Sequence, residues 1–129
     1  MSGSAEGALH TAITAALRGV AGLNRVDPGQ PVRTTPPSAE LGPIAGSDWS
    51  TKDSAGREVR VTVTIRDLAE QPARLHALNA AAEAAVAALP RAVDGWRIAS
   101  CVLLKNRVAG EKAGSWAAVS EWRIRVLAL

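Results

Sequence analysis

Hydrophobic and polar residues alternate along two segments of the chain, 57–66 and 116–129. In the first segment, hydrophobic side chains occupy every second position: Val59, Val61, Val63 and Ile65. In the second, one face holds Trp122, Ile124 and Val126, and the other face holds Glu121, Arg123 and Arg125. A period of two is that of a β-strand. The pattern therefore predicts two strands that each bury one face and expose the other.

Two other segments have the 3.6-residue period of an amphipathic helix. The first, at about 5–21, follows Ser4, whose hydroxyl can cap the free N–H groups of the first turn. Its hydrophobic stripe consists of Leu9, Ile13, Ala16, Leu17 and Val20. The second helix is predicted from about Pro72 to Leu89, where Pro90 stops it. Asp67 and Glu70, just before it, have the spacing of a capping box.

The remaining pattern predicts strands at 44–51 and 96–105, a turn at 52–56 and a glycine-containing loop at 106–115. Together with the two alternating segments, these strands would make two hairpins, one on each side of the second helix. The order helix-strand-strand-helix-strand-strand predicts an α+β fold. We expect a mostly antiparallel four-stranded sheet with the helices packed on one face.

Between the first helix and the first hairpin lies a proline-rich arm, residues 24–43, which holds five of the seven prolines. Proline removes backbone donors and stiffens the chain. A connection of this length in a compact domain is usually a binding segment or a linker. We expect either the same domain or a neighbouring copy to hold the arm, which makes it a candidate contact between subunits.

Composition narrows the class of protein. The 129 residues, 47% hydrophobic and 21% charged, predict one domain, 1–129, with a real hydrophobic core. No hydrophobic run has the length of a membrane span, and the first residues lack the basic start and apolar run of a signal peptide. The net charge of +3 is not gathered in one run, which argues against a dedicated nucleic-acid binder. A lone cysteine, Cys101, fits a reducing compartment.

Few residues could carry catalysis. His10, His76 and Cys101 are the only residues of the usual nucleophile and base types, and each lies on a different predicted element. No metal-binding or phosphate-binding motif is present, so the sequence predicts no cofactor and no metal. A buried thiol and surface histidines account for the three residues equally simply.

Two further features admit two interpretations. Trp49, near the predicted turn, either packs at the end of the sheet or anchors an interface, where tryptophan is enriched. Four arginines fall on the polar faces of the two alternating strands: Arg60, Arg66, Arg123 and Arg125. They either protect an exposed sheet or line a surface that faces a polyanion.

Across residues 5–128 the chain resembles the phage tail completion, or tail terminator, family of long-tailed phages and gene transfer agents. The resemblance rests on hydrophobic positions and turn residues rather than on catalytic motifs. The family's proline-hydrophobic step corresponds to Pro43-Ile44, without the usual aromatic residue after the proline. The other matching segments are Thr51-Lys52-Asp53, Gly56-Arg57-Glu58, 59–67, the helix positions Leu75, Leu78, Val86 and Leu89, and the closing strands 96–104 and 122–127.

The resemblance implies a structural virion protein, not an enzyme, that needs no cofactor and no membrane. Six copies would form a ring on the head-proximal end of the tail tube, where it contacts the tube protein and the head-neck connector. DNA would cross its pore without sequence recognition. Such a protein is assembled in the bacterial cytoplasm into a phage or gene transfer agent particle.

The same resemblance assigns expected contact residues. The subunit or tube interface would comprise Trp49, Lys52, Asp53, Arg57, Pro36 and Pro37, and the lumen or wet sheet face would comprise Arg60, Arg66, Arg123 and Arg125. Two alternatives stay open. One is another neck protein of the same particle, such as a head-completion component. The other is a small ligand-binding α+β domain or enzyme with a pocket near Cys101 or His76.

Overall fold

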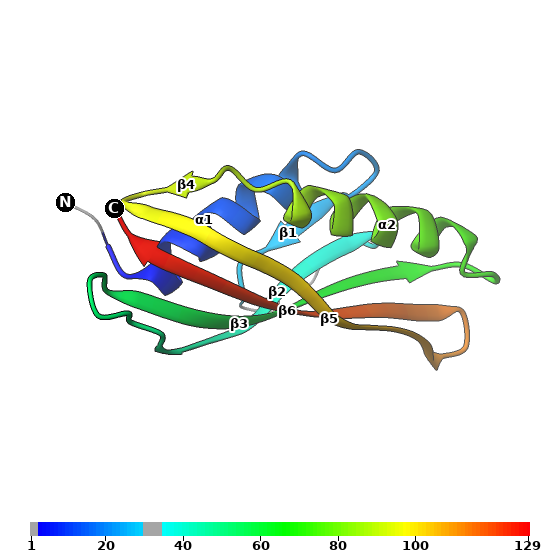
Figure 1. Cartoon of the computed structure of the whole chain (residues 1–129). Helices are drawn as coiled ribbons and strands as arrows, with labels where there is room; N and C mark the ends of the chain where they lie inside the picture. Colours follow the sequence, from blue (N-terminus) through cyan, green and yellow to red (C-terminus); the bar gives the residue numbers. More distant parts are fainter. Residues whose placement is uncertain (1–2, 30–34) are drawn as a thin grey trace.

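Two helices cover one face of a strongly curled sheet (Figure 1). This computed structural model describes residues 3–29 and 35–129. Its elements are α1 (Ala5–Arg18), β1 (Arg25–Asp27), β2 (Ser38–Asp48), β3 (Gly56–Leu68), α2 (Ala73–Ala87), β4 (Ala92–Val93), β5 (Trp96–Lys112) and β6 (Ser115–Ala128). The β2–β3 turn lies at one end of the sheet and the β5–β6 turn at the opposite end.

The expected mostly antiparallel four-stranded sheet is wrong. The sheet has six strands in the order β1-β2-β3-β6-β5-β4, it is mixed because β1 runs parallel to β2, and it curls into a half-barrel. The two additional strands escaped prediction because β1 and β4 are three and two residues long, too short to show a period. At the centre, β3 pairs with β6 along its whole length, from Gly56↔Leu127 to Leu68↔Ser115.

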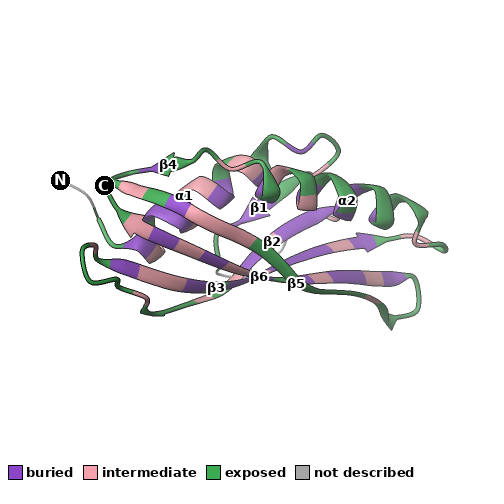
Figure 2. Cartoon of the chain, viewed as in Figure 1, coloured by how far each residue is buried: buried purple, intermediate pink, exposed green. Residues whose placement is uncertain are grey.

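The core lies between the helices and the sheet. Both alternating segments bury the face that the pattern predicted, and Figure 2 shows buried residues alternating along β3 and β6. The large side chains that are almost fully buried come from both helices and from β2, β3 and β6: Leu9, Ile13, Leu17, Leu75, Val86, Leu41, Val59, Val61, Val63, Ile65, Ile124 and Val126. Burial of this hydrophobic surface is the main force that holds α1 and α2 on the sheet.

The helix termini agree with the sequence at one helix and differ at the other. Ser4 caps α1, because its Oγ accepts a hydrogen bond from the Gly7 amide at 3.0 Å. The predicted capping box before α2 is wrong, since Pro72 is the N-cap residue of that helix and makes no side-chain cap. The Asp67 carboxylate binds the Arg74 guanidinium instead, at 2.6 and 2.8 Å.

The cap gives a direct prediction for α1. Replacing Ser4 with alanine is expected to lower the free energy of unfolding by about 1 kcal/mol, because the Gly7 amide loses its acceptor. Urea denaturation measures the change. Thr11→Ala, an exposed substitution within the same helix, is the matched control and should not destabilise. Equal losses from both substitutions would contradict the role of the cap.

The second hairpin is longer than predicted. β5 continues to Lys112, and residues 113–114 make the turn, so the loop expected at 106–115 is wrong. Gly114 has a φ of 75°, a left-handed conformation that glycine adopts without strain and that permits this tight turn. The glycines of this segment had indicated a loop, but they belong to an exposed strand and its tight turn.

The proline-rich arm is partly built into the sheet. Its residues 25–27 form β1 and its residues 38–43 form the first half of β2, while residues 30–34 lie outside the described part of the chain. The Asn24 amide donates to the Pro37 carbonyl at 2.8 Å, and the Asn24 side chain donates to the Thr35 and Pro36 carbonyls at 3.1 Å each. The same chain therefore holds residues 35–37 in place.

Candidate assembly surfaces

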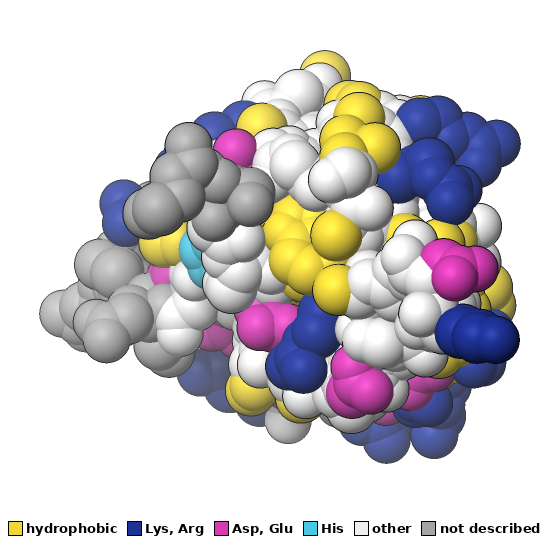
Figure 3. All heavy atoms as spheres, turned by 60° about the vertical axis from the view of Figure 1, so that its left-hand side comes forward, with side chains coloured by type: hydrophobic (Ala, Val, Ile, Leu, Met, Phe, Trp, Pro, Cys, Tyr) yellow, Lys and Arg dark blue, Asp and Glu magenta, His cyan; other side chains and the backbone are white. Residues whose placement is uncertain are grey.

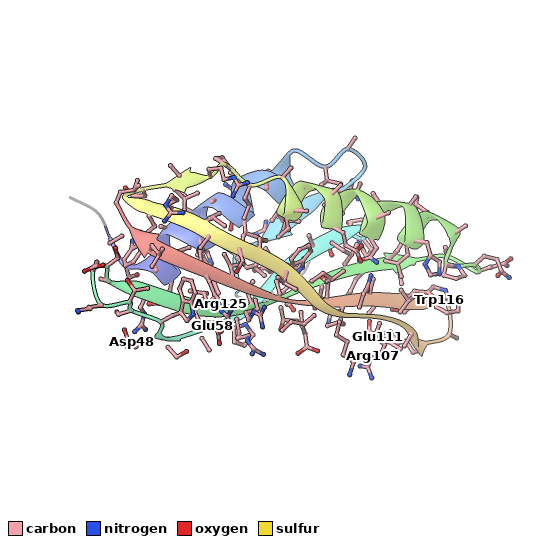
Figure 4. All side chains as sticks on the ribbon, viewed as in Figure 1. Asp48, Glu58, Arg107, Glu111, Trp116 and Arg125 are labelled. Atoms are coloured by element: carbon pink, nitrogen blue, oxygen red, sulfur yellow. The ribbon has the colours of Figure 1, made fainter. Side chains whose placement is uncertain are left out.

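The β2–β3 hairpin end carries an ordered cluster on the face of the sheet opposite the helices. The Arg125 guanidinium lies 5.3 Å from the centroid of the Trp49 ring, a cation–π contact. Arg125 Nε also donates to the Glu58 carboxylate at 2.9 Å, and Arg60 lies 3.8 Å from the same carboxylate. The hydrogen bond from Arg125 lowers the pKa of Glu58, which keeps the cluster ionised. Figure 4 shows Arg125 and Glu58 side by side, with Asp48 nearby at the hairpin end.

The expected interface residues do not form one surface. Trp49, Lys52 and Asp53 gather at the β2–β3 hairpin end, where Lys52 and Asp53 are exposed. Arg57 turns to the helix side, where its Nε lies 3.1 Å from the Glu6 carboxylate of α1. Arg57 lies two residues before the buried Val59 on β3, so the two side chains point to the same face of the strand. This spacing is a signal in the sequence that could have placed Arg57 on the helix side.

Pro36 and Pro37 lie elsewhere. They come just before Ser38, which pairs with Arg66 at the opposite end of β3 from the hairpin. Pro37 is buried and Pro36 is half-buried. They therefore hold the start of β2 and do not add to the exposed surface at the β2–β3 hairpin end.

The four arginines of the polar face divide into two groups. Arg60 and Arg123 are direct cross-strand partners, and Arg125 pairs across from Glu58 next to them. Arg66 lies at the other end of β3 and contacts Glu40 at 3.4 Å and Glu111 at 3.3 Å. Two arginines directly opposite each other repel, and the buried Nε of Arg123 finds no hydrogen-bond partner in the described part of the chain.

The surface around the β2–β3 hairpin end carries both positive and negative side chains. On the face shown in Figure 3, lysines and arginines form several separate groups with acidic side chains between them. This agrees with the sequence, in which no single basic run or stripe was found. A contact with DNA on such a surface would involve the phosphate backbone and not the bases.

The opposite end of the sheet is held together by contacts that the sequence did not reveal. Trp116 Nε1 donates to the Ala69 carbonyl at 3.0 Å, and the Ala69 amide donates to the Gly114 carbonyl at 2.9 Å. These bonds, with the Arg66–Glu111 contact, fix the β5–β6 turn beside the end of β3. Figure 4 shows Trp116, Glu111 and Arg107 on this hairpin. The β5–β6 hairpin is therefore a second fixed element at the surface.

An exposed hydrophobic run on β5 was not predicted from the sequence. Val102, Leu103 and Leu104 are 36%, 36% and 41% exposed. Their three consecutive positions break the alternation of a half-buried strand, and that is the signal that could have found them. Leu104 reaches the polar face, where it lines a hollow of about 130 Å³ whose walls also include Pro43 and Ala45 of β2.

The residues considered for catalysis are not assembled into a site. The His10 ring bonds the Pro28 carbonyl at 2.6 Å, His76 is exposed on α2, and Cys101 Sγ lies 3.8 Å from the Val86 carbonyl. Burial raises the pKa of the Cys101 thiol, the opposite of what a nucleophilic thiolate requires. The cavity beside Cys101, about 240 Å³, is lined by Ala87, Leu89, Arg91, Ile98 and Ser100.

Residues 3–29 and 35–129 hold neither a cluster of metal ligands nor a membrane-spanning helix. Within these ranges, no group of three or more histidine, cysteine or acidic residues could hold a metal ion. No helix in the same ranges is long and apolar enough to cross a membrane. The features left to explain function are the two hairpin ends, the arginine-bearing face and the hydrophobic run of β5.

Comparison with known proteins identifies the family. A family model described as tail completion protein gp17 matches residues 11–127. The chain belongs to this family. The chain is also similar to a chain in a solved structure described as the virion of a native gene transfer agent particle, with 27% identity and a TM-score of 0.79. That match covers 97% of this chain and 99% of the other. No curated protein matches the sequence.

The predicted resemblance is thereby confirmed. A tail completion protein is a structural protein of the virion tail and not an enzyme. The match covers both hairpins and both sides of the sheet, so the assembly surfaces described above belong to the part of the chain that the family shares. It also favours the tail over the head-completion alternative.

Proposed function

We propose that this tail completion protein is the tail terminator, acting as one domain. Six copies form a ring on the head-proximal end of the tail tube, stop its growth and present a docking surface to the head-neck connector. The observation that carries the proposal is the match of almost the whole chain to a virion protein of the same fold. Identical subunits that join by unlike surfaces make a closed ring when the rotation between them closes.

The β2–β3 hairpin end supplies contacts with the neighbouring subunit or the tube. Trp49 presents a large aromatic side chain whose position Arg125 fixes, and Lys52 and Asp53 stand exposed beside it. Such a residue is pre-organised for binding, because little conformational freedom remains to be lost. Arg57 supports the hairpin from the α1 side, and Pro36 and Pro37 support the start of β2.

The polar face of the sheet faces the lumen in this proposal. Arg60, Arg123 and Arg125 lie together near the β2–β3 hairpin end, and Arg66 lies further along β3. Glu58 and Glu40 neutralise part of their charge. A moderately basic wall attracts the phosphate backbone independently of sequence, and the neutralisation by Glu58 and Glu40 limits that attraction, so DNA can pass.

Tail length tests the proposed function. In a producer strain that lacks the gene, electron microscopy of lysates should show overlong or ragged tails without heads, because nothing stops the tube. Restoring the gene should restore normal length, which is the control. Tails of normal length that fail to join heads would place the protein in the neck, and wholly normal particles would overturn the proposal.

A double variant tests the hairpin end. Replacing Trp49 and Arg57 with alanine is expected to block assembly of particles while the isolated protein stays folded. The cation–π contact and the Arg57–Glu6 ion pair are both at the surface, and each contributes about 1 kcal/mol or less. Particle yield measures assembly, and circular dichroism monitors folding.

Glu6→Gln is the matched control for this variant. It weakens the same ion pair from the α1 side and leaves the Trp49 side chain and its contact with Arg125 unchanged. Particle yield should therefore stay near that of the unmodified protein. Normal assembly of the Trp49 and Arg57 double variant would contradict the assignment of the interface.

A further inference from the structure

The sheet has two open edges, and they lie on opposite sides of it. β4 pairs only with Trp96 and Arg97 of β5, so among the described residues no strand covers positions 99–112 on that side. β1 pairs only with residues 38–40 of β2, which leaves 44–48 without a strand partner among the described residues. Each open edge presents backbone N–H and C=O groups that another strand can pair with.

The open part of β5 is also the most hydrophobic part of the described surface. Of the five large hydrophobic residues exposed there, three are consecutive on this strand: Val102, Leu103 and Leu104. Consecutive side chains of a strand point to opposite faces. The edge is therefore apolar on both faces, and a strand laid beside it would bury side chains above and below. A run of this kind usually marks an interaction site.

We propose that neighbouring copies join edge to edge, with residues 99–104 of one copy lying antiparallel to residues 44–48 of the next. This inference rests on the proposed ring and names the surfaces that close it. The occupant of the β5 edge is thus a second copy of this chain. It contributes Ile44 and Ala45, which are half-buried and exposed in the isolated chain.

Strand direction favours this arrangement. β2, β3, β6 and β5 alternate in direction, so β5 runs opposite to β2. Rotation about a ring axis that is roughly parallel to the strands preserves the direction of each strand. β5 of one copy therefore meets β2 of the next in the antiparallel sense, and the joined sheets continue the same ladder. A two-fold axis perpendicular to the strands would instead pair identical edges, β5 with β5 or β2 with β2.

Charge complementarity favours the same register. If Ala45 lies beside Val102, Asp48 lies beside position 99, next to the exposed Arg97. The apolar residues then meet beside a pair of opposite charges, Asp48 and Arg97, a pattern typical of specific interfaces.

The edges also carry features that limit unspecific pairing. β5 has bulges between Ile98 and Ser100 and between Leu103 and Lys105, and β2 has one between Leu41 and Ile44. Bulges and charged residues protect exposed edges from arbitrary strands. They restrict pairing to a short segment, so the contact is weak between free subunits and becomes stable when the ring closes on the tube.

Cysteine cross-linking in assembled tails tests the contact. In a Cys101→Ser background, which removes the native thiol, Ala45→Cys and Val102→Cys are combined in one chain. Mild oxidation should give a ladder of linked subunits on a non-reducing gel. Each single cysteine variant is the control and should give no ladder. Absence of a ladder from tails that contain the double variant overturns the edge contact.

A charge substitution provides the second measurement. Leu104→Glu should reduce the amount of this protein per tail at least about tenfold, because it places a charge in an apolar contact. Leu68→Glu is the matched control, since Leu68 is exposed at the end of β3, outside both proposed edge segments. It should leave incorporation unchanged. Equal incorporation of both variants overturns the proposed contact, and thermal unfolding verifies that both proteins fold.

The tail-length assay separates this inference from the proposed function. If Leu104→Glu protein still terminates tails at normal length, the edge contact is wrong and the terminator function stands. If tails are normal without the gene, the terminator function is wrong. In that case cross-linking of assembled particles that contain the double-cysteine protein still decides the edge contact: a ladder supports it, and the absence of a ladder overturns it.

Discussion

Replacing Asp67 with asparagine is expected to lower the free energy of unfolding by about 1.5–3 kcal/mol at pH 7, the range for hydrogen bonds to charged groups. The Asp67 side chain is 2% exposed, and its carboxylate accepts two hydrogen bonds from Arg74 and one from the Leu68 amide. Asparagine keeps the shape but loses the charge and one acceptor. The Arg74 guanidinium, which is more than half exposed, then has water as its main partner.

This effect should depend on pH in a defined direction. Arg74, helped by the Leu68 amide, holds the pKa of Asp67 below its usual range. Stability from the ionised carboxylate is therefore fully present above the unfolded pKa of about 3.9. It is lost as the pH falls through the lower folded pKa. The difference in free energy of unfolding between the native protein and Asp67→Asn should therefore have its full size at pH 7. It should become smaller below about pH 4.

Urea denaturation at pH 7 and at pH 3 measures both quantities. Glu111→Gln is the matched control, because Glu111 pairs with Arg66 at the surface, where its side chain is 42% exposed. An exposed ion pair contributes about 0–1 kcal/mol, so this control should change stability little at either pH. Similar losses of unfolding free energy from Asp67→Asn and Glu111→Gln would contradict the prediction, because they would show that the buried Asp67 stabilises the fold no more than an exposed ion pair does.

The parts of the fold that were predictable are those fixed by local pattern. Alternation along 57–66 and 116–129 identified β3 and β6, because these strands bury one face along most of their length. The stripe from Leu9 to Val20 identified α1 for the same reason. Each of these elements makes its periodicity visible without knowledge of its partner.

The missed features depend on partners that are distant in sequence. β1 is a strand because residues 38–40 lie beside it, and its three residues carry no period of their own. The bond from Trp116 to the Ala69 carbonyl and the use of Asp67 by Arg74 appear only once β3, β6 and α2 are in place. The open edge of β5 depends on strand order, which the sequence pattern did not determine.

The candidate contact residues show the same division. Trp49 was expected near a hairpin end and lies there, because turn residues between two strands define that position. Its contact with Arg125 joins β6 to the turn and requires the β3–β6 pairing. Arg57 was grouped with Trp49 through the family resemblance, which matches residues 56–58 to the hairpin tip, but strand alternation sends Arg57 to the α1 side.

Substitution of Gly56 with alanine is expected to damage the hairpin end directly. A methyl group there would overlap the Trp49 carbonyl oxygen and lie 3.0 Å from Leu127 Cδ2. The Trp49 amide donates to the Gly56 carbonyl at 2.9 Å, so the two backbones cannot separate without breaking this bond. Overpacking of this kind costs about 1–3 kcal/mol. Urea denaturation measures the loss.

Gly110→Ala is the matched control for this substitution. A methyl group at Gly110 finds its nearest neighbour at 3.7 Å, an ordinary contact, near the opposite end of the sheet. Its stability and particle yield should stay close to those of the native protein. Loss of stability with unchanged particle yield in Gly56→Ala would mean that Trp49 tolerates displacement and lies outside the interface. A particle yield that falls further than the loss of stability explains would support the hairpin end as the contact, because the substitution moves the Trp49 backbone away from the position that Arg125 fixes.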